Sequence, residues 1–245
     1  MEIPKSHPRY KSLMKRERVV KGVENGMVVL EGLIAHGRGE AFDYLIGEKT
    51  TKHALIAEKT AVAHIITAKN PVLSINGNTA VLAGKHIVEF AKITGAKIEV
   101  NLFYRTEARV KKLCEFIRSL GAERVLGEVG NAHIPGLEHP RGICSMEGIY
   151  RADVVLLALE DGDRTEALKK MGKTVIAIDL NPLSRTARTA DVTIVDDVER
   201  AYMNMCALAM KMKVYGTKHL EEIKESFDNE NNLREILRQI CKRFE

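Results

Sequence analysis

Tryptophan is absent from this sequence, and other aromatic residues are scarce, so aromatic side chains make up only 5% of the chain. A core must therefore be built mainly from Val, Ile, Leu, Ala and Met. Hydrophobic residues occupy 45% of the 245 positions, which is ordinary for a globular protein. The shortage of aromatics also argues against a surface for single-stranded nucleic acid, on which bases stack against aromatic rings.

Long hydrophobic runs are missing as well. No apolar stretch approaches the roughly 20 residues that a helix needs to span a bilayer. The N-terminal stretch MEIPKSHPRYKSLMKRERVV lacks the apolar segment of a signal peptide. We therefore expect a cytoplasmic protein that does not act in a membrane.

Cysteine is rare and unpatterned. The four cysteines form no C-x-x-C pair and have no zinc-like spacing: Cys114, Cys144, Cys206 and Cys241. In a cytoplasmic protein the expected state of such residues is a buried, reduced thiol.

The sequence also lacks long segments in which charges of one sign are concentrated. The chain has 38 Lys and Arg against 33 Asp and Glu, which gives a net charge of +5 and a pI near 8.9. Outside the N-terminal stretch KSLMKRERVVK, the cations are interleaved with acids. A basic nucleic-acid-binding module is one interpretation of this balance, and a small anionic substrate explains it equally well.

The order of apolar patterns predicts the fold. Residues 1–70 have helical patterns and no strand signal, whereas beyond Pro71 strands alternate with helices. Six short apolar runs are predicted strands: 72–75, 97–103, 124–127, 153–159, 174–178 and 192–195. Alternating strands and helices indicate right-handed βαβ units around a parallel sheet. We expect an α/β, doubly wound, Rossmann-like sheet with strand order 3-2-1-4-5-6.

Three regions follow from this pattern. They are an N-terminal helical region (1–70), a Rossmann-like core (71–212) and C-terminal helices (213–245), combined in one integrated domain. The last region contains a helix with an apolar stripe, in the stretch NLREILRQICKRF. The methionines of VERAYMNMCALAMKMKV are interpreted as core or subunit packing.

Polar side chains follow nearly every predicted strand, and the carboxyl ends of parallel strands share one edge of the sheet, where ligands bind. These positions are therefore the candidate site: Asn76, Gly77 and Asn78 after the first strand, Arg105 after the second, Asn131 and His133 after the third, the EDGD stretch after the fourth, Asp179, Leu180 and Asn181 after the fifth, and Asp196 and Asp197 after the sixth.

The second half of the sheet has the form of a mononucleotide-binding unit, in which Asp179 would bind the ribose hydroxyls. Its turn, EDGD, is acidic and is not G-x-G-x-x-G, so it would repel a bare pyrophosphate. This disfavours a nicotinamide-dependent oxidoreductase, which stays open as an alternative, and favours ATP with Mg²⁺. Arg185, Arg188 and the glycine-flanked Arg38 could bind the phosphates.

Each of these features also has a purely structural interpretation. The NPLS stretch could cap a helix, with Asn181 at the N-cap and solvated arginines beyond it. HGRGE could be a plain helix break, and Asp196 and Asp197 could cap the next helix. His36 and His133 could be hydrogen-bonded structural histidines.

Four blocks of the sequence together resemble the archaeal 4-phosphopantoate–β-alanine ligase family, also called phosphopantothenate synthetase: HPRYKSLMKRE, GLIAHGRGEAFDYLIGE, PVLSINGN and IDLNPLSRTAR. The resemblance extends over essentially the whole chain. It implies a homodimeric, ATP-dependent ligase of coenzyme A biosynthesis. Such an enzyme joins 4-phosphopantoate to β-alanine and releases 4'-phosphopantothenate, AMP and pyrophosphate.

The resemblance also implies where ATP binds. The matching residues of this sequence are Arg16, Arg38, Asp179, Leu180, Asn181, Arg185, Thr186, Asp197 and Val198. The release of AMP favours an acyl-adenylate intermediate, in whose formation Arg38 would neutralise developing charge on the phosphates.

The remaining assignments are hypotheses for the other substrates. The phosphate of 4-phosphopantoate would bind at the turn of Asn76, Gly77 and Asn78 together with Arg105, because the nucleotide occupies the other half of the sheet. His133 is the one histidine of this edge that we propose as a base for the β-alanine amine. The sequence does not indicate which acidic residues would hold Mg²⁺.

Overall fold

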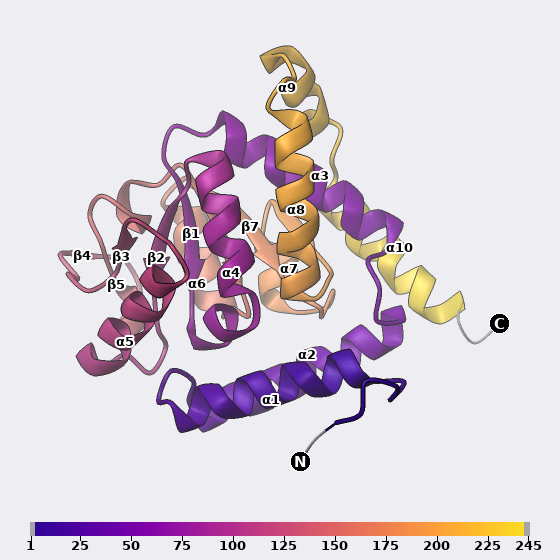
Figure 1. The fold of residues 1–245 in the computed structure, drawn as a ribbon. Helices are drawn as coiled ribbons and strands as arrows, with labels where there is room; N and C mark the ends of the chain where they lie inside the picture. Colours follow the sequence, from indigo (N-terminus) through magenta and orange to yellow (C-terminus); the bar gives the residue numbers. More distant parts are fainter. Residues whose placement is uncertain (1–2, 243–245) are drawn as a thin grey trace.

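The computed structural model describes residues 3–242, and a six-stranded parallel sheet lies at its centre (Figure 1). The strand order is β3-β2-β1-β6-β7-β8. The strands are β1 (Pro71–Ile75), β2 (Lys97–Val100), β3 (Val125–Leu126), β6 (Val154–Ala158), β7 (Thr174–Ile178) and β8 (Val192–Ile194). This is the predicted doubly wound order 3-2-1-4-5-6, so the expected fold class and the existence of all six strands are confirmed.

Burial on both faces explains why the central strands are continuously apolar. All five residues of β1 and all five of β6 are buried, and the two strands pair in parallel with Leu73 opposite Leu156. Alternate residues of β6 face two separate hydrophobic cores, one containing Leu156 and the other Leu157. A strand covered on both faces needs apolar side chains at every position.

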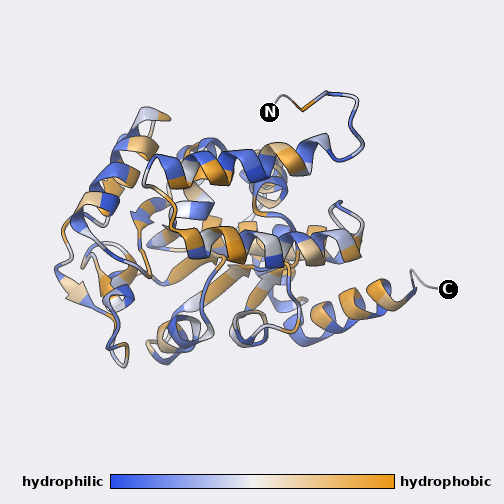
Figure 2. Cartoon of the chain, turned by 90° about the horizontal axis from the view of Figure 1, so that it is seen from below, coloured by the Kyte–Doolittle hydropathy of each residue, from blue (hydrophilic) through white to orange (hydrophobic). Residues whose placement is uncertain are grey.

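Four helices in the described part of the chain cover one face of the sheet. They are α3 (Lys52–Thr67), α4 (Gly77–Thr94), α5 (Glu107–Ser119) and α8 (Val198–Met212), and their buried side chains share one core with the strands. The other face is covered by α6 (Gly162–Lys170), by the 3-10 helix Ile149–Arg151 and by a small two-stranded hairpin. Viewed from the carboxyl edge, the apolar strands lie between these helical layers (Figure 2).

The predicted helical N-terminal region is confirmed. α1 (Tyr10–Glu24) and α2 (Leu30–Ile46) lie side by side across the carboxyl edge of the sheet, below the strands in Figure 1. The loop between the two helices packs tightly on the start of α4, because a Cβ at Gly77 would come within 2.3 Å of the carbonyl oxygen of Met27. The pair of helices α1 and α2, the α1–α2 hairpin, therefore covers the edge at which a doubly wound sheet binds its ligands.

The C-terminal helices are also present. α9 (Thr217–Glu225) packs on α3, and α10 (Asn229–Cys241) packs beside α2, β8 and the short helix α7 (Arg185–Thr189). In α10, Leu233 and Ile236 form a third small core with Ile46 of α2. Phe244, the last residue of the predicted apolar stripe, lies outside the described residues.

Two local features were not predicted. Strands β4 (Ala132–His133) and β5 (Ile143–Cys144) form an antiparallel hairpin within the crossover from β3 to β6. Predicted strand 97–103 ends earlier, at Val100, and Asn101 instead donates side-chain hydrogen bonds to the carbonyls of Arg141 and Ile143. The crossover is thereby anchored beside the carboxyl edge.

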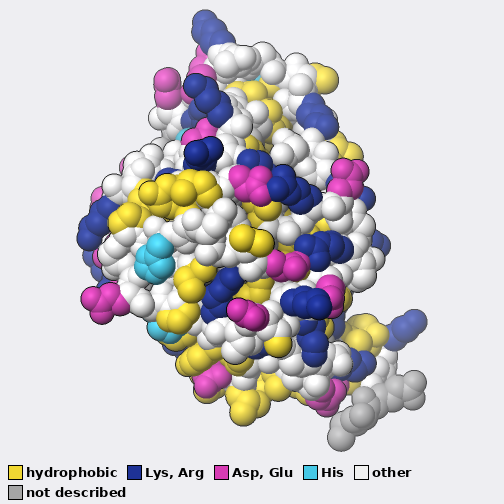
Figure 3. Space-filling model, turned by 90° about the vertical axis from the view of Figure 1, so that its left-hand side faces the viewer, with side chains coloured by type: hydrophobic (Ala, Val, Ile, Leu, Met, Phe, Trp, Pro, Cys, Tyr) yellow, Lys and Arg dark blue, Asp and Glu magenta, His cyan; other side chains and the backbone are white. Residues whose placement is uncertain are grey.

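The expected buried, free thiols are found at Cys114, Cys144 and Cys206, whereas the prediction is wrong for Cys241, which is exposed near the end of α10. Within residues 3–242, none of the helices is both long and apolar enough to cross a membrane. Basic and acidic side chains are interspersed on the face shown in Figure 3.

Candidate functional site

A pocket of about 690 Å³ lies between α2 and the carboxyl edge of the sheet. Its volume falls within the roughly 300–1,000 Å³ of ordinary ligand sites. One face of α2 and the segments after four strands contribute to its lining: Asn76–Asn78 after β1, Leu102–Tyr104 after β2, Leu159–Gly162 after β6, and both Asp179–Asn181 and Ser184–Thr186 after β7. The structure therefore brings the segments after β1, β2, β6 and β7 together, as the strand order predicts.

Asp179 follows β7 and fixes the conformation of the turn behind it. Its two carboxylate oxygens accept hydrogen bonds from the backbone N–H of Asn181, at 2.9 Å, and from the hydroxyl of Ser184. Burial raises the pKa of Asp179, and these two hydrogen bonds together with Arg38 oppose the rise. Each carboxylate oxygen retains a further lone pair, so the side chain can still accept a ligand hydroxyl.

Ser184, not Asn181, is the side chain that caps α7, since its hydroxyl accepts from the N–H of Ala187 at 2.9 Å. The prediction that the NPLS stretch caps a helix is therefore confirmed, but the prediction that Asn181 is the N-cap is wrong. The Asn181 oxygen accepts from the N–H of Leu183 within the turn. Both Asp179 and Asn181 line the pocket while they shape this turn.

Arg185 and Thr186 connect the segments after β6 and β7. The Thr186 hydroxyl donates to the carbonyl of Glu160 at 2.9 Å, and Arg185 forms an ion pair with Asp163. A Cβ at Gly162 would lie 2.2 Å from Nε of Arg185, so the absence of a side chain there makes room for the arginine. Arg188, in contrast, is exposed and is not part of the pocket lining.

The turn after β1 is held rigidly. Asn76 caps α4 by accepting from the N–H of Thr79 at 3.0 Å, and its amide donates to the carbonyl of Ala158 at 2.9 Å. Asn78 donates to the carbonyl of Gly32 in α2 at 2.7 Å. The two asparagine side chains thus hold the neighbouring strand and α2 in place, while the start of α4 faces the pocket.

The segment HGRGE does not break a helix, because α2 continues through it to Ile46. The small residues instead allow close packing, and the position of a Cβ at Gly39 lies 3.5 Å from a methyl group of Leu180. Arg38 is exposed at the pocket wall opposite Asp179, whose pKa it lowers. The helix therefore carries Arg38 to the part of the sheet edge that follows β7.

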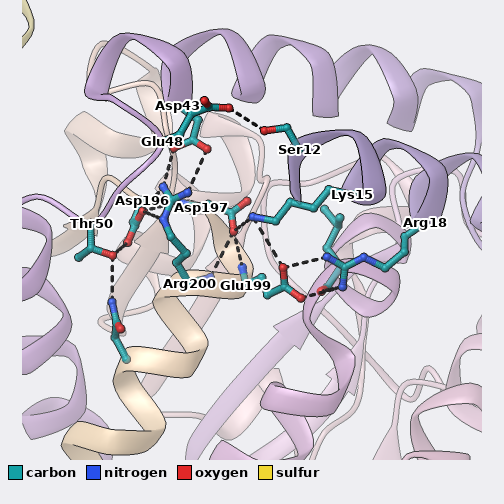
Figure 4. Close-up of polar contacts among 12 residues, drawn as sticks. Ser12, Lys15, Arg18, Asp43, Glu48, Thr50, Asp196, Asp197, Glu199 and Arg200 are labelled. Carbon is teal, nitrogen blue, oxygen red and sulfur yellow. Dashed lines mark hydrogen bonds and ion pairs between the residues drawn. The ribbon is translucent and has the colours of Figure 1, made fainter. Parts of the chain in front are cut away.

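A smaller cavity adjoins the pocket between α1, α2 and the start of α8. Nζ of Lys15 lies 2.5 Å from a carboxylate oxygen of Asp197 (Figure 4), and the same oxygen of Asp197 caps α8. Burial alone would raise the pKa of Asp197, but Lys15 and Arg200 outweigh it and hold the pKa below its usual value. Burial lowers the pKa of His36, which also lines this cavity.

Behind the cavity, a buried acid pair joins α3 to the end of β8. Asp196 accepts from Thr50 at 2.5 Å and pairs with Arg200, which also pairs with Asp43 (Figure 4). Glu58 is fully buried; burial and the neighbouring Asp196 raise its pKa to about 9. At neutral pH the carboxyl groups of Glu58 and Asp196 therefore hold one proton between them.

The predicted site residues that lie outside the lining of the large pocket are Arg16, Arg105, Asn131, His133, Asp163, Arg188, Asp196, Asp197 and Val198. The last three line the adjoining cavity, and Arg16 forms an ion pair with Glu40 at its border.

Arg105 and His133 do not approach either cavity. The Arg105 guanidinium donates to the carbonyl of Gly127 at 2.7 Å, and His133 is exposed in β4. Arg105 is outside both linings, and its Nη1 is buried without a hydrogen-bond partner among the described residues. The phosphate-binding role of Arg105 and the role of His133 as a base both stay predictions.

Sequence reasoning missed Arg109 and Arg141, which both line the pocket. Arg109 lies in the first turns of α5, and Arg141 lies in the crossover before β5. The alternation of strands and helices predicts a helix after the second strand, which was the available signal for Arg109. For Arg141 there was none, because the crossover has no regular periodicity.

Among residues 3–242, no group of three or more His, Cys, Asp or Glu side chains is arranged to hold a metal ion. The acidic EDGD stretch is largely committed to cations of the protein, since Glu160 pairs with Arg141 and Arg164, and Asp163 pairs with Arg185.

The doubly wound sheet, its polar carboxyl edge and the pocket beneath α2 define the class: an α/β protein with a small-molecule site at the switch point between β1 and β6. The profile of one family, phosphopantothenate/pantothenate synthetase, matches residues 53–243, and the chain belongs to that family.

Relatives over the whole chain agree with this assignment. A 4-phosphopantoate--beta-alanine ligase of Thermococcus onnurineus is 54% identical over 245 residues, which is 100% of this chain and 94% of that protein. The protein of the same name from Thermococcus kodakarensis is 53% identical over the same span. One from Methanosarcina mazei is 52% identical over 98% of this chain and 94% of its own length.

Proposed function

We propose that this protein is an ATP-dependent 4-phosphopantoate–β-alanine ligase that produces 4'-phosphopantothenate, AMP and pyrophosphate for coenzyme A biosynthesis. The observation that carries the proposal is the convergence of Arg38, Asp179 and Arg185 on one pocket at the switch point. The names of the full-length relatives support the same reaction.

ATP is proposed to occupy the half of the pocket formed by β7 and α2. Asp179 would accept the ribose hydroxyls, and Leu180 and Asn181 would flank the nucleoside. Arg38 from α2, together with Arg185 and Thr186 from α7, would face the phosphates.

The nucleoside would extend toward the smaller cavity. Asp197 and Val198 line it, and Arg16 lies at its border through its ion pair with Glu40. The pairing of Lys15 with Asp197 keeps this side of the site compact before a ligand arrives.

The reaction is proposed to pass through an acyl-adenylate. A carboxylate oxygen of 4-phosphopantoate attacks the α-phosphorus of ATP, a P–O bond forms, and the bond to the β-phosphate breaks to release pyrophosphate. The free amine of β-alanine then attacks the acyl carbon, and AMP leaves with the former carboxylate oxygen. The protein contributes positioning and cationic stabilisation, in which Arg38 has the central role.

Mg²⁺ is expected to arrive with the nucleotide. A magnesium ion in such sites is held by one or two carboxylates together with substrate phosphates, and it neutralises phosphate charge. The described part of the chain holds no ready-made cluster of three acidic or other metal-binding side chains. Asp163 of the EDGD stretch, which is exposed and pairs with Arg185, is one carboxylate that could contact such an ion.

We also propose a cytoplasmic homodimer. Large apolar side chains remain exposed on α2, where Leu30 is 68% and Ile34 is 65% accessible, and on the outer side of α8. Apolar patches of this kind are typical of subunit interfaces. Neither nucleic acid nor a membrane is expected as a partner, since the cations of the sequence are interleaved with acids outside the N-terminal stretch.

Replacing Arg38 tests the proposed function at its centre. The variant Arg38→Ala should lower kcat by about 10²–10³-fold, the range for loss of a group that stabilises transition-state charge. The exposed side chain leaves the fold intact, so the melting temperature should not change. Wild-type kinetics in this variant would remove Arg38 from the site.

A further inference from the structure

The end of the pocket away from Asp179 carries two arginines that the nucleotide does not need. Arg109 and Arg141 both line it, beside the first residues of α4 and the aromatic side chain of Phe103. The Cζ atom of Arg141 lies 5.8 Å from the centre of the Phe103 ring. This end lies beside β2 and the crossover, on the far side of the switch point from β7.

Arg109 is a half-buried cation with no ion pair among residues 3–242. Its guanidinium donates only to backbone carbonyls, those of Tyr104 and Met27, and its Nε is buried without a hydrogen-bond partner. Burial lowers the pKa of Arg109 more than nearby Glu31 raises it, yet an arginine remains charged in proteins. Glu31, which also lines the pocket, is close enough to act on this charge but forms no ion pair with it among the described residues, so the guanidinium can still bind an anion.

Arg141 supplies an independent observation. Its side chain is only 8% exposed, and its Nε is also buried without a partner. Its other nitrogens pair with Glu160 at 2.5 Å and with Asp161 at 2.8 Å. Glu160 also pairs with buried Arg164, at 2.5 Å, so two carboxylates balance these two guanidinium groups, and the unpaired Nε is what Arg141 offers to a ligand.

The start of α4 completes the arrangement. Asn76 caps the helix through the N–H of Thr79, and its carbonyl accepts from Ala80, which leaves the N–H groups of Gly77 and Asn78 beside the pocket. Such unpaired amides and the positive end of an 18-residue helix favour a negatively charged group. The helix end and the two arginines therefore form one anion-binding end of the pocket.

We infer that Arg109, Arg141 and the N-terminus of α4 bind the phosphate of the acid substrate, and that Arg109 makes the ligase select the phosphorylated acid. The inference rests on the proposed function. It places the two phosphorylated substrates at opposite ends of one pocket, so that the carboxylate lies between them and faces the α-phosphate. It also moves the phosphate contact from Arg105, whose guanidinium faces Gly127, to Arg109.

Steady-state kinetics of Arg109→Gln and Arg109→Lys test the inference. Loss of a hydrogen-bonded charge in Arg109→Gln should raise the KM for 4-phosphopantoate about 10- to 100-fold, while the KM for ATP stays within about 2-fold. Arg109→Lys keeps the positive charge but lacks the paired N–H donors of the guanidinium, so its KM for 4-phosphopantoate should lie between those of the wild type and Arg109→Gln. The exposed, same-helix variant Lys111→Gln removes one positive charge at a distance and should match the wild type.

Arg109→Gln also loses the hydrogen bond to the carbonyl of Met27 and could loosen the α1–α2 loop. A binding measurement distinguishes this structural effect from the loss of a phosphate contact. Calorimetric titration with 4-phosphopantoate should show a weaker Kd for Arg109→Gln, and titration with unphosphorylated pantoate should give the same Kd for variant and wild type. An equal loss for both acids would mean a structural effect and would overturn the inference. So would a 4-phosphopantoate defect in Arg105→Gln without one in Arg109→Gln.

The outcomes separate this inference from the function on which it rests. If the wild type forms AMP from ATP, 4-phosphopantoate and β-alanine but Arg109→Gln keeps the wild-type KM, the inference alone fails. If the wild type forms no AMP with these substrates, the proposed function fails and the inference fails with it.

Discussion

At the scale of single residues, the proposed functional positions also maintain the local structure. Asp179 holds the turn after β7 through Asn181 and Ser184, and Asn76 holds β6 while it caps α4. The structural and functional interpretations of the sequence were therefore not alternatives for these residues. A preorganised turn presents its polar groups without reorganisation when a ligand binds.

The first prediction concerns Asp179. The variant Asp179→Asn should weaken ATP binding by about 10-fold or more, because a charged acceptor for the ribose is lost. Calorimetric titration with ATP measures the effect. The control is Asp191→Asn, which removes a carboxylate at the opposite end of β7, where Asp191 accepts from the N–H of Val175. ATP affinity that is unchanged in Asp179→Asn would contradict the ribose role.

Gly77 gives a second prediction, on stability. An alanine there would place a Cβ 2.3 Å from the carbonyl oxygen of Met27, so the α1–α2 loop must shift. We expect a destabilisation of about 1–3 kcal/mol, the usual range for overpacking. Thermal unfolding measures it, and hydrogen exchange should rise in the α1–α2 hairpin. The control Gly216→Ala has open space around it and should melt close to the wild type.

At the scale of elements, the fold could be predicted from the sequence to a large extent. Six strands, their order and the N-terminal helices follow from hydrophobic periodicity and the rules for parallel sheets. The β4–β5 hairpin could not be predicted, since each of its strands has only two residues and its register depends on contacts with Asn101. Arg141 was missed for the same reason.

The lining of the candidate pocket was predictable where it lies directly after a strand. Asp179 and Asn76 were found because strand ends share one edge of the sheet. Side-chain direction was not predictable: Arg105 and Arg109 are four residues apart, yet only Arg109 lines the pocket. Which of two neighbouring arginines faces a cavity depends on the start of α5 and on the position of the α1–α2 loop, and both are tertiary features.

The buried acid pair between α3 and β8 makes stability depend on pH. Because the pKa of Glu58 is about 9 in the folded protein and near 4.5 when unfolded, the folded state holds the extra proton between these values. Its contribution is fully present below pH 4.5 and is lost as pH rises through 9, at up to ~1.4 kcal/mol per pH unit.

Glu58→Gln should therefore flatten the decline in unfolding free energy between pH 6 and pH 9, while the exposed control Glu115→Gln should not. The amide that this substitution introduces can still bond with Asn204 and Asp196. Denaturant unfolding at several pH values gives the comparison. Parallel curves for wild type and Glu58→Gln would mean that Glu58 is ionised in the folded protein.

At the scale of the whole molecule, the exposed apolar residues predict a dimer. Met203 and Met210 lie on one face of α8 and are 51% and 57% accessible, whereas Met205 and Met212 of the same helix are buried. The methionines of this helix thus divide into core residues and surface residues. Sedimentation velocity should give twice the 27.3 kDa mass of the chain.

A double variant, Met203→Lys with Met210→Lys, should shift the dimer toward monomer, because charges on both would have to be buried. The control, Lys211→Glu, changes an exposed charge beside them. A monomeric wild type at micromolar concentration would contradict the proposed assembly, and a dimer unaffected by the double variant would exclude this face.

The central claim is the reaction itself, and one measurement tests it most directly. Purified protein is incubated with ATP, Mg²⁺ and β-alanine, together with either 4-phosphopantoate or pantoate, and AMP is quantified. The account predicts AMP in equal amount to 4'-phosphopantothenate with the phosphorylated acid, and far less AMP with pantoate. Formation of ADP in place of AMP, or no nucleotide turnover with 4-phosphopantoate, would contradict it.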